Sequence, residues 1–232
     1  METVPCPISD STEFTPWLQV PDRFDSSGKK RWQLVQSCAS GLIMLNPRPE
    51  SSESALHYRN GQYDPYLHAG SNARLSERAY LAARSLLLRY RASLILKEAV
   101  KPLKKLSILE IGCATGELLN FFHRSKGIPL DYLAGIEPDA ASAAYAREVF
   151  GLRVSPFLQD GYPKKFDCIV LWHTLEHIHS LNETLHRVAS LLEPNGGCRR
   201  ERRLGRCPSP SRQRFGRCRG TWDGSAQCPW QV

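Results

Sequence analysis

Two hydrophobic periods alternate along the chain between residues 106 and 197. Short apolar runs, which are typical of buried strands, occur at 106–111, 132–137, 152–157 and 166–172. Other segments place apolar residues at every third or fourth position and are therefore predicted to be amphipathic helices. These predicted helices span 116–127, 139–151 and 180–197. Strands that alternate with helices predict an α/β fold with a mostly parallel, doubly wound sheet.

The boundaries of the helices carry their own signals. Asp139 is a predicted N-cap, because its side chain can accept a hydrogen bond from a free backbone N–H group, and Gly151 can end the same helix. Ser180 and Glu183 have the spacing of a capping box, and the Pro-Asn-Gly-Gly stretch at 194–197 is expected to stop the third helix.

The region before residue 106 carries weaker patterns. Residues 1–30 are rich in proline, serine and aspartate and are expected to be loosely structured. Residues 31–49 alternate and then run apolar, which predicts a strand pair. A helix is predicted from Arg74 to Val100, with Arg and Lys outside an apolar stripe formed by Leu75, Ala79, Ala82, Leu86, Tyr90 and Leu94. For this helix, packing on the domain is favoured over membrane binding.

A glycine-containing loop joins the first predicted strand of the sheet to the first helix. In the stretch LEIGCATG (109–116), Gly112 and Gly116 would let the backbone turn sharply and approach a ligand. The glycines are four positions apart, so the loop does not match a dinucleotide-binding fingerprint. It does not match a phosphate-binding P-loop either, because no Gly-Lys-Ser/Thr follows. A tight turn with no ligand is the alternative interpretation.

Acidic residues stand at the ends of the next two predicted strands. Glu137 ends the second strand, where a carboxylate can accept hydrogen bonds from both hydroxyls of a ribose. Asp160 stands near the end of the third strand, where it could accept a hydrogen bond from an adenine amino group. Ligands of open α/β sheets bind at the carboxyl ends of the strands, so this order of residues favours a nucleoside-bearing ligand.

The stretches LEIGCATGELL, GIEPD, FLQDG and FDCIVLWHTLEHI, in this order, resemble successive motifs of class I S-adenosylmethionine-dependent methyltransferases. The resemblance covers about residues 31–197. It implies a Rossmann-like α/β fold, S-adenosylmethionine as cofactor, and transfer of its methyl group to an acceptor, which we expect to be a small molecule. An inactive cofactor-binding remnant is the alternative.

The same resemblance assigns candidate site residues. It implies that Glu110 supports the methionine end of the cofactor; the alternative is that this residue is merely a solvated strand end. The residues implied to bind the cofactor are Glu110, Gly112, Cys113, Ala114, Gly116, Glu137, Pro138, Asp160, Gly161 and His173. His173 and His177 are the candidates for a catalytic base, because the pKa of histidine suits proton transfer near neutral pH.

The same histidines also spell a metallopeptidase signature. His173, Glu176 and His177 form H-x-x-E-H, which binds zinc when both histidines lie on one helix. Here an apolar strand directly precedes the motif, so a strand end and a turn are predicted and metal binding is not. Two roles remain open for these histidines. Either they contact the cofactor directly, or His177 and His179 have a structural role in capping and packing.

Eight cysteines are scattered along the chain, and we expect the four before residue 198 to be free thiols in a reducing compartment. The segment before the core resembles the N-terminal extension of one bacterial branch of the family, in which two C-x-x-C pairs suggest a zinc ribbon. In this chain Cys6 is followed by Ser9, and Ser37 and Ser40 replace the second pair, with Cys38 out of register. No structural zinc is therefore expected.

The composition changes abruptly at Cys198. Residues 198–232 hold nine arginines, one glutamate and one aspartate, and so carry +7 of the net charge of +8. They lack an apolar run, which predicts a disordered tail and a sheet that is incomplete on its C-terminal side. Translation in a shifted frame is the favoured explanation, and a basic arm that binds nucleic acid is the rival. Three parts result, at 1–73, 74–197 and 198–232.

The remaining patterns concern location. No run of about eighteen apolar residues is present, so no membrane span is expected. The N-terminus shows no basic start followed by an apolar run, which makes a cytoplasmic location the expectation.

Overall fold

The computed structural model describes residues 1–22, 25, 27–51, 53, 75–97, 99, 101–159, 162 and 164–200. The chain divides into two compact units. The described residues up to Glu53 form the first unit, together with His179–Asn182. The second unit holds the other described residues and contains all the predicted site residues that the structure describes.

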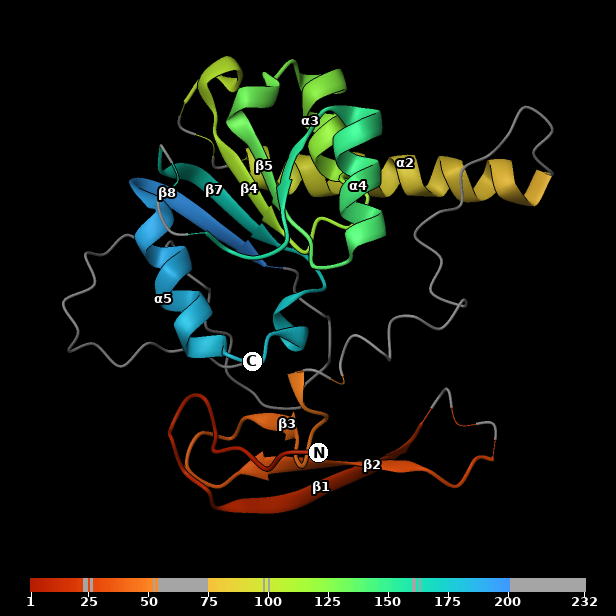
Figure 1. Ribbon diagram of the computed structural model, residues 1–232, viewed down its shortest axis with the longest axis vertical. Helices are drawn as coiled ribbons and strands as arrows, with labels where there is room; N and C mark the ends of the chain where they lie inside the picture. The colour runs from red at the N-terminus through yellow and green to blue at the C-terminus, as the bar shows by residue number, and fades with distance from the viewer. Residues whose placement is uncertain are drawn as a thin grey trace. The chain divides into compact units, whose positions relative to one another are not determined.

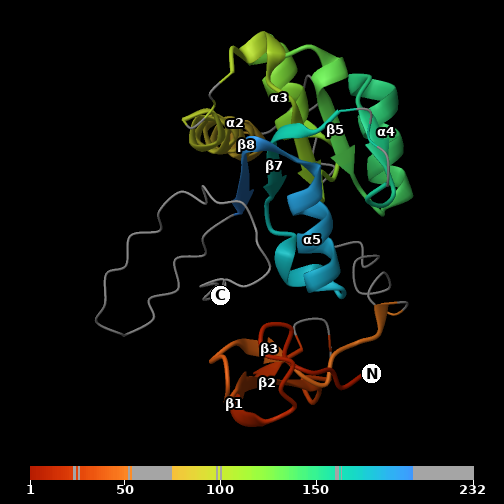
Figure 2. The ribbon, with the colours of Figure 1, turned by 90° about the vertical axis from the view of Figure 1, so that its left-hand side faces the viewer.

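A three-stranded antiparallel sheet forms the first unit (Figure 2). Its strands are β1 (Phe14–Pro21), β2 (Arg31–Ser37) and β3 (Ile43–Leu45), in the order β1-β2-β3. The strand pair predicted at 31–49 is confirmed. The expectation of a loose segment over 1–30 is wrong for β1, which pairs with β2 along its length. The prolines of β1 hid the strand in the sequence, but an edge strand tolerates proline because one row of its backbone groups has no partner.

The helix α2 (Leu75–Leu96) confirms the helix predicted at 74–100, although it ends four residues earlier. Its buried face differs from the predicted stripe. Leu86 and Tyr90, which were expected to pack, are 68% and 58% exposed, whereas Ala92 and Ile95 are buried in the core. The last turns of α2 thus pack the helix against the hydrophobic core of the second unit.

A five-stranded parallel sheet is the centre of the second unit (Figure 1). Its strands are β4 (Ile108–Ile111), β5 (Leu133–Ile136), β6 (Arg153–Ser155), β7 (Phe166–Leu171) and β8 (Leu192–Arg200). The helices between them are α3 (Glu117–Lys126), α4 (Ala140–Phe150) and α5 (Leu181–Leu191), with short 3-10 turns at Leu103–Lys105, Leu130–Tyr132 and Leu175–His177. The predicted α/β fold with a parallel, Rossmann-like sheet is confirmed.

The predicted helix caps are present for α4. The Asp139 carboxylate accepts a hydrogen bond of 2.8 Å from the Ser142 backbone N–H, and Gly151 ends the helix in the left-handed conformation. Gly127 ends α3 in the same way. The helix α5 begins directly after Ser180, as expected.

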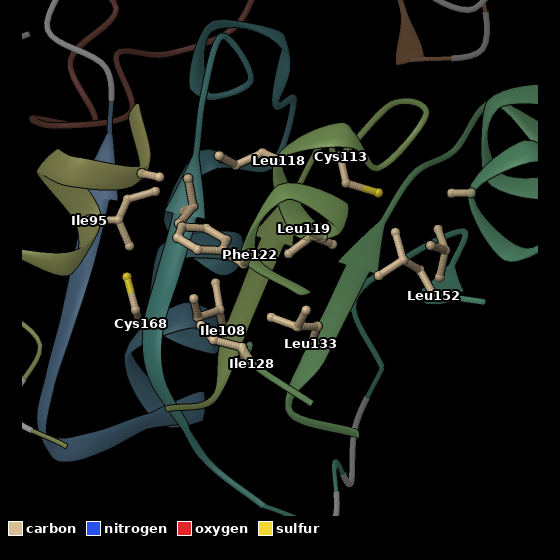
Figure 3. Close-up of a cluster of buried hydrophobic side chains, with 14 of the residues drawn as sticks. Ile95, Ile108, Cys113, Leu118, Leu119, Phe122, Ile128, Leu133, Leu152 and Cys168 are labelled. Atoms are coloured by element: carbon tan, nitrogen blue, oxygen red, sulfur yellow. The ribbon is translucent and has the colours of Figure 1, made fainter. Parts of the chain in front are cut away.

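Two hydrophobic clusters cover the two faces of the sheet, because successive strand residues point to opposite sides. Ile108 and Cys168 face a cluster that includes residues of α2, α3 and α4 (Figure 3). Leu109 and Ile169 face the other side, where Val188 of α5 packs. By the same alternation, Glu110 lies on the face that α2 and α3 cover.

The strand β8 was not predicted from the sequence. The third helix was expected to continue to the Pro-Asn-Gly-Gly stretch, with no strand after it, but α5 ends at Leu191. Residues Gly197–Arg200 pair in parallel with Cys168–Leu171 of β7 after an irregularity in register. Backbone hydrogen bonds need no apolar side chains, so an edge strand can form where the hydrophobic pattern predicts none. The core therefore extends beyond residue 197, to at least Arg200.

Replacing Phe122 with alanine tests the packing of α3 against the sheet. This side chain is fully buried, so the variant should lose about 3–5 kcal/mol of unfolding free energy. Phe157→Ala is the matched control, since Phe157 is 67% exposed, and it should stay within about 0.5 kcal/mol. Denaturant titration of both variants measures the difference, and equal losses would contradict the packing role of Phe122.

Candidate functional site

The order of the strands, β6-β5-β4-β7-β8, places the site. From β4 the chain moves outward through β5 to β6, then crosses back to β7 on the other side of β4. Such a reversal opens a crevice at the carboxyl ends of the central strands, where ligands of doubly wound sheets bind. The residues that follow β4, β5 and β7 are therefore the candidates.

The loop after β4 has an unusual backbone. Gly112, Ala114 and Gly116 have φ angles of +74°, +48° and +76°, all in the left-handed region. The Ile136 carbonyl oxygen accepts hydrogen bonds from the N–H groups of Gly112 (2.8 Å) and Cys113 (3.0 Å). These two bonds fix the loop to the end of β5 and bring its backbone beside Glu137.

Glycine is required at two positions of this loop. A Cβ atom on Gly112 would lie 2.3 Å from Thr174 Oγ1, and one on Gly116 would lie 2.5 Å from Leu152 Cδ1. Thr174 is held in place, because its Oγ1 lies 3.0 Å from the Ile111 carbonyl oxygen and 3.1 Å from that of Trp172. The segment after β7 thus packs directly on the glycine loop.

Glu137 follows β5 and binds the glycine loop through its carboxylate. Its Oε2 accepts a hydrogen bond of 2.8 Å from the Ala114 N–H, and its Oε1 accepts one of 2.9 Å from the Asp139 N–H. Burial raises the pKa of Glu137, while these two hydrogen bonds act in the opposite direction. A carboxylate offers about four acceptor positions, so capacity remains on both oxygens for donors of a ligand.

Glu110 is a buried carboxyl group within β4. It is 5% exposed, and its Oε2 has no hydrogen-bond partner in the described part of the chain. Burial raises the pKa of Glu110 to about 8; the positive charge of Arg91 on α2 opposes this rise, and the negative charge of Glu137 adds to it. Glu110 is therefore not the solvated strand end that the sequence left open.

A cation–π contact lies close to this carboxyl group. The guanidinium carbon of Arg91 on α2 is 4.6 Å from the centre of the ring of Trp172, which follows β7. A separate ion pair of 2.6 Å, between Arg84 and Glu117, joins α2 to α3. Arg91, Trp172 and Thr174 were not singled out in the sequence. A basic residue on a helix and residues after a strand are too common as patterns to be assigned to a site. Only the tertiary structure places Thr174 against Gly112, and Arg91 near Trp172 and Glu110.

The raised pKa of Glu110 predicts how stability changes with pH. Because the pKa in the folded state (about 8) lies above the ordinary value of 4.5, the contribution of this group is fully present below pH 4.5 and is lost as pH rises through 8. The variant Glu110→Gln should flatten the dependence of unfolding free energy on pH between these values. Urea titrations at several pH values measure it, and an unchanged slope would contradict the assignment.

Other predicted site residues are placed as follows. The Cys113 side chain is buried, and its Sγ atom packs over Gly135 of β5, so a ligand would meet the backbone of this residue and not its thiol. Burial raises the pKa of that thiol. Pro138 is exposed beside Glu137. Asp160 and Gly161 lie outside the described residues.

His173, Glu176 and His177 do not share one α-helix. His173 follows β7 with a φ of +54°, and Glu176 and His177 belong to a single 3-10 turn. This is the strand end and turn that the sequence predicted, and it differs from the helix that a metallopeptidase motif needs. Among the described residues no three side chains of His, Cys, Asp or Glu gather in a way that could hold a metal ion. Both histidines are exposed, and His173 Nδ1 lies 4.0 Å from Glu176 Oε1.

Comparison with known families identifies the class of protein. The sequence profile of a methyltransferase domain family matches residues 77–221, more than half of the chain. The chain therefore belongs to this family, which confirms the resemblance to class I S-adenosylmethionine-dependent methyltransferases. Among curated proteins no sequence matches.

Solved structures provide more distant likenesses. The aminopentose methyltransferase CalS10 from Micromonospora echinaspora, solved with bound S-adenosylmethionine, is 19% identical, with a TM-score of 0.42 over 57% of each chain. DesVI from Streptomyces venezuelae is 20% identical, with a TM-score of 0.40 over 56% of this chain and 57% of its own. PKMT2 from Rickettsia typhi, in complex with AdoHcy, is 21% identical, with a TM-score of 0.36 over 41% of this chain and 20% of its own. The chain thus spans 20–57% of the lengths of these structures.

In the part of the chain that the structure describes, no helix is both long and apolar enough to cross a membrane.

Proposed function

We propose that this chain is a methyltransferase that moves the methyl group of S-adenosylmethionine to a small-molecule acceptor. The observation that carries the proposal is the joint arrangement of the glycine loop with Glu137 and Glu110 at the switch point of the sheet. A turn without a ligand would need neither a buried carboxyl oxygen without a partner nor a second carboxylate fixed beside the loop.

Each part of the cofactor has a proposed set of contacts. Glu137 accepts hydrogen bonds from the ribose hydroxyls, using the acceptor positions that its two backbone bonds leave open. Glu110 faces the ammonium group of the methionine part, and the loop of Gly112, Cys113, Ala114 and Gly116 lies between Glu110 and Glu137. Asp160 and Gly161 are proposed at the adenine, Pro138 beside the ribose, and His173 at the edge of the crevice.

The cofactor, when bound, supplies a methyl group on a positively charged sulfur. This sulfur is a good leaving group, because it becomes neutral when the methyl group is transferred. The protein then needs mainly to position an acceptor in line with that methyl group. If the acceptor is a hydroxyl or an acidic carbon, the imidazole of His173 or His177 takes up its proton. Both side chains are exposed and follow β7, at the carboxyl end of the sheet.

The test has two stages. Binding of S-adenosylmethionine to the full chain is measured by calorimetry, and transfer of a labelled methyl group to fractionated small molecules is then followed together with the release of S-adenosylhomocysteine. With the cofactor at saturating concentration, the double variant His173→Ala/His177→Ala should lose at least about a hundredfold in turnover, the low end for general base catalysis.

Each outcome separates two functions. Binding with transfer supports the enzyme. Binding without transfer to any fraction supports an inactive remnant that retains the cofactor site. Absence of binding contradicts both. Normal turnover in the histidine double variant would remove the proposed base but leave the transferase.

The organisation into an N-terminal part at 1–73, a methyltransferase core from 74 and an arginine-rich part after the core is also a proposal, as is a cytoplasmic location. The shifted-frame explanation of residues 198–232 predicts that another reading frame of the gene continues with an apolar strand after Gly197. Resequencing across codons 190–232 and translating all frames tests it. If no other frame continues the fold, the basic segment becomes the candidate for salt-dependent binding of nucleic acid.

A further inference from the structure

Four small polar side chains meet between two turns of the first unit. Cys6 and Ser9 flank one turn, and Ser37 and Ser40 flank the other, each pair separated by two residues. The Cys6 Sγ atom lies 3.1 Å from Ser40 Oγ, and Ser9 Oγ lies 3.4 Å from Ser37 Oγ. Cys6 and Ser37 are 0% and 1% exposed, so these two members of the cluster lie in the interior of the first unit.

Backbone N–H groups point at the same side-chain atoms. Ser37 Oγ accepts a hydrogen bond of 3.3 Å from the Ser40 N–H, and Ser40 Oγ accepts one of 3.2 Å from the Leu42 N–H. Burial alone would raise the pKa of Cys6, but hydrogen bonds from Ser40 and Ser9 outweigh it and lower the pKa to about 7. Both turns thus present donors that favour negative charge at their side-chain atoms.

The two pairs have the spacing and convergence of a tetrahedral zinc site, but not its chemistry. Structural zinc takes four ligands, normally cysteine thiolates or histidines, in C-x-x-C pairs from two turns. A serine hydroxyl does not ionise near neutral pH, so only Cys6 of the four could supply a zinc ligand.

We propose that Cys6, Ser9, Ser37 and Ser40 form a metal-free counterpart of a four-cysteine zinc site, in which hydrogen bonds between the side chains join the two turns. The backbone still has the geometry of the metal site, so three serine-to-cysteine changes are sufficient to create one. The wild-type chain does not hold zinc at this cluster.

The composition of the first unit explains why such a link between the turns is useful. Among its described residues only Cys6, Val35 and Leu42 are buried hydrophobics. A unit of this size with so small a core usually depends on a metal or on disulfides for stability. The cluster ties the N-terminal turn to the turn between β2 and β3, which is the role that a zinc ion would have.

The variant Ser9→Cys/Ser37→Cys/Ser40→Cys in the full chain tests the geometry. We expect one equivalent of zinc per chain by elemental analysis and, after replacement with cobalt(II), the absorption of tetrahedral thiolate coordination. The matched control Ser11→Cys/Ser37→Cys/Ser40→Cys has the same number of cysteines but breaks the pair spacing, and should bind at least about tenfold more weakly. Equal zinc binding by both variants, none by either, or one equivalent in the wild type would overturn the proposal.

A second comparison keeps the proposal testable if the triple variant does not fold. Cys6→Ser retains a hydrogen-bonding atom, whereas Cys6→Ala removes it and leaves its neighbours without a partner. We expect amide hydrogen exchange in β2 and β3 of the full chain to change less than about threefold in Cys6→Ser and to rise at least about tenfold in Cys6→Ala. If alanine protected these amides as well as serine did, Cys6 would be a packing residue only, and the proposal would fail.

Discussion

Replacing Gly112 with alanine is expected to weaken S-adenosylmethionine binding by roughly a hundredfold or more. Two costs combine at this position. The new side chain must occupy a φ of +74°, which disfavours residues with a Cβ atom by about 1–2 kcal/mol. The Cβ atom would also lie 2.3 Å from Thr174 Oγ1, so the loop or the threonine must move. Calorimetry with the purified variant measures the loss of affinity.

Gly127→Ala is the matched control for the Gly112 variant. Gly127 has a φ of +68°, but a Cβ atom there would meet nothing within 4 Å. This control should lose stability through the backbone alone and bind the cofactor as the wild type does. Similar affinities for the two variants would show that the glycine loop does not contact the cofactor. A further change of Thr174→Ala in the Gly112→Ala background should recover part of the affinity, because it removes the atoms that the new Cβ approaches.

Replacing Glu137 with alanine is expected to weaken cofactor binding at least tenfold. The carboxylate would be lost both as the proposed partner of the ribose and as the acceptor for the Ala114 and Asp139 N–H groups. Hydrogen bonds to a charged group contribute about 1.5–3 kcal/mol each, and the loss of one ribose contact already accounts for a factor of ten. Calorimetric titration with S-adenosylmethionine gives the affinity directly.

Two comparisons isolate the role of Glu137 in binding. Glu148→Ala removes an exposed carboxylate from α4 and should leave the affinity unchanged. Adenosine, which carries the ribose but not the methionine part, should lose as much binding free energy in Glu137→Ala as the full cofactor does. If the affinity for both ligands stayed at the wild-type value, Glu137 would have no role beyond holding the glycine loop.

The sequence predicted the fold of the second unit well, because its signals are local and periodic. Apolar runs identified β4 and β7, and Asp139 and Gly151 marked the two ends of α4, which the structure reproduces. The prediction missed two strands whose side-chain pattern does not reveal the pairing of their backbones. Prolines concealed β1, and polar residues concealed β8, yet both strands pair through their backbones at the edge of a sheet.

The residues of the candidate site likewise fall into those that local sequence patterns identified and those that they did not. Residue type and position after a strand identified Gly112, Gly116 and Glu137, since a sharp turn and an acidic strand end are local features. The environment of Glu110 was not predictable, because its burial depends on α2, a helix that precedes β4 in the sequence by a dozen residues. The hydrophobic stripe predicted for α2 was itself wrong, so Arg91 could not have been assigned to the core-facing side.

By itself the sequence therefore determined the class of fold, the order of its motifs and the family to which the chain belongs. These features depend on patterns within a few residues, and such patterns can be interpreted because helices and strands have fixed hydrophobic periods. Only the tertiary structure decided that Thr174 packs on Gly112, that Glu110 is buried beside Arg91, and that four small side chains meet between two distant turns. Each of these depends on which segments become neighbours in space, and that is set by packing of the whole unit.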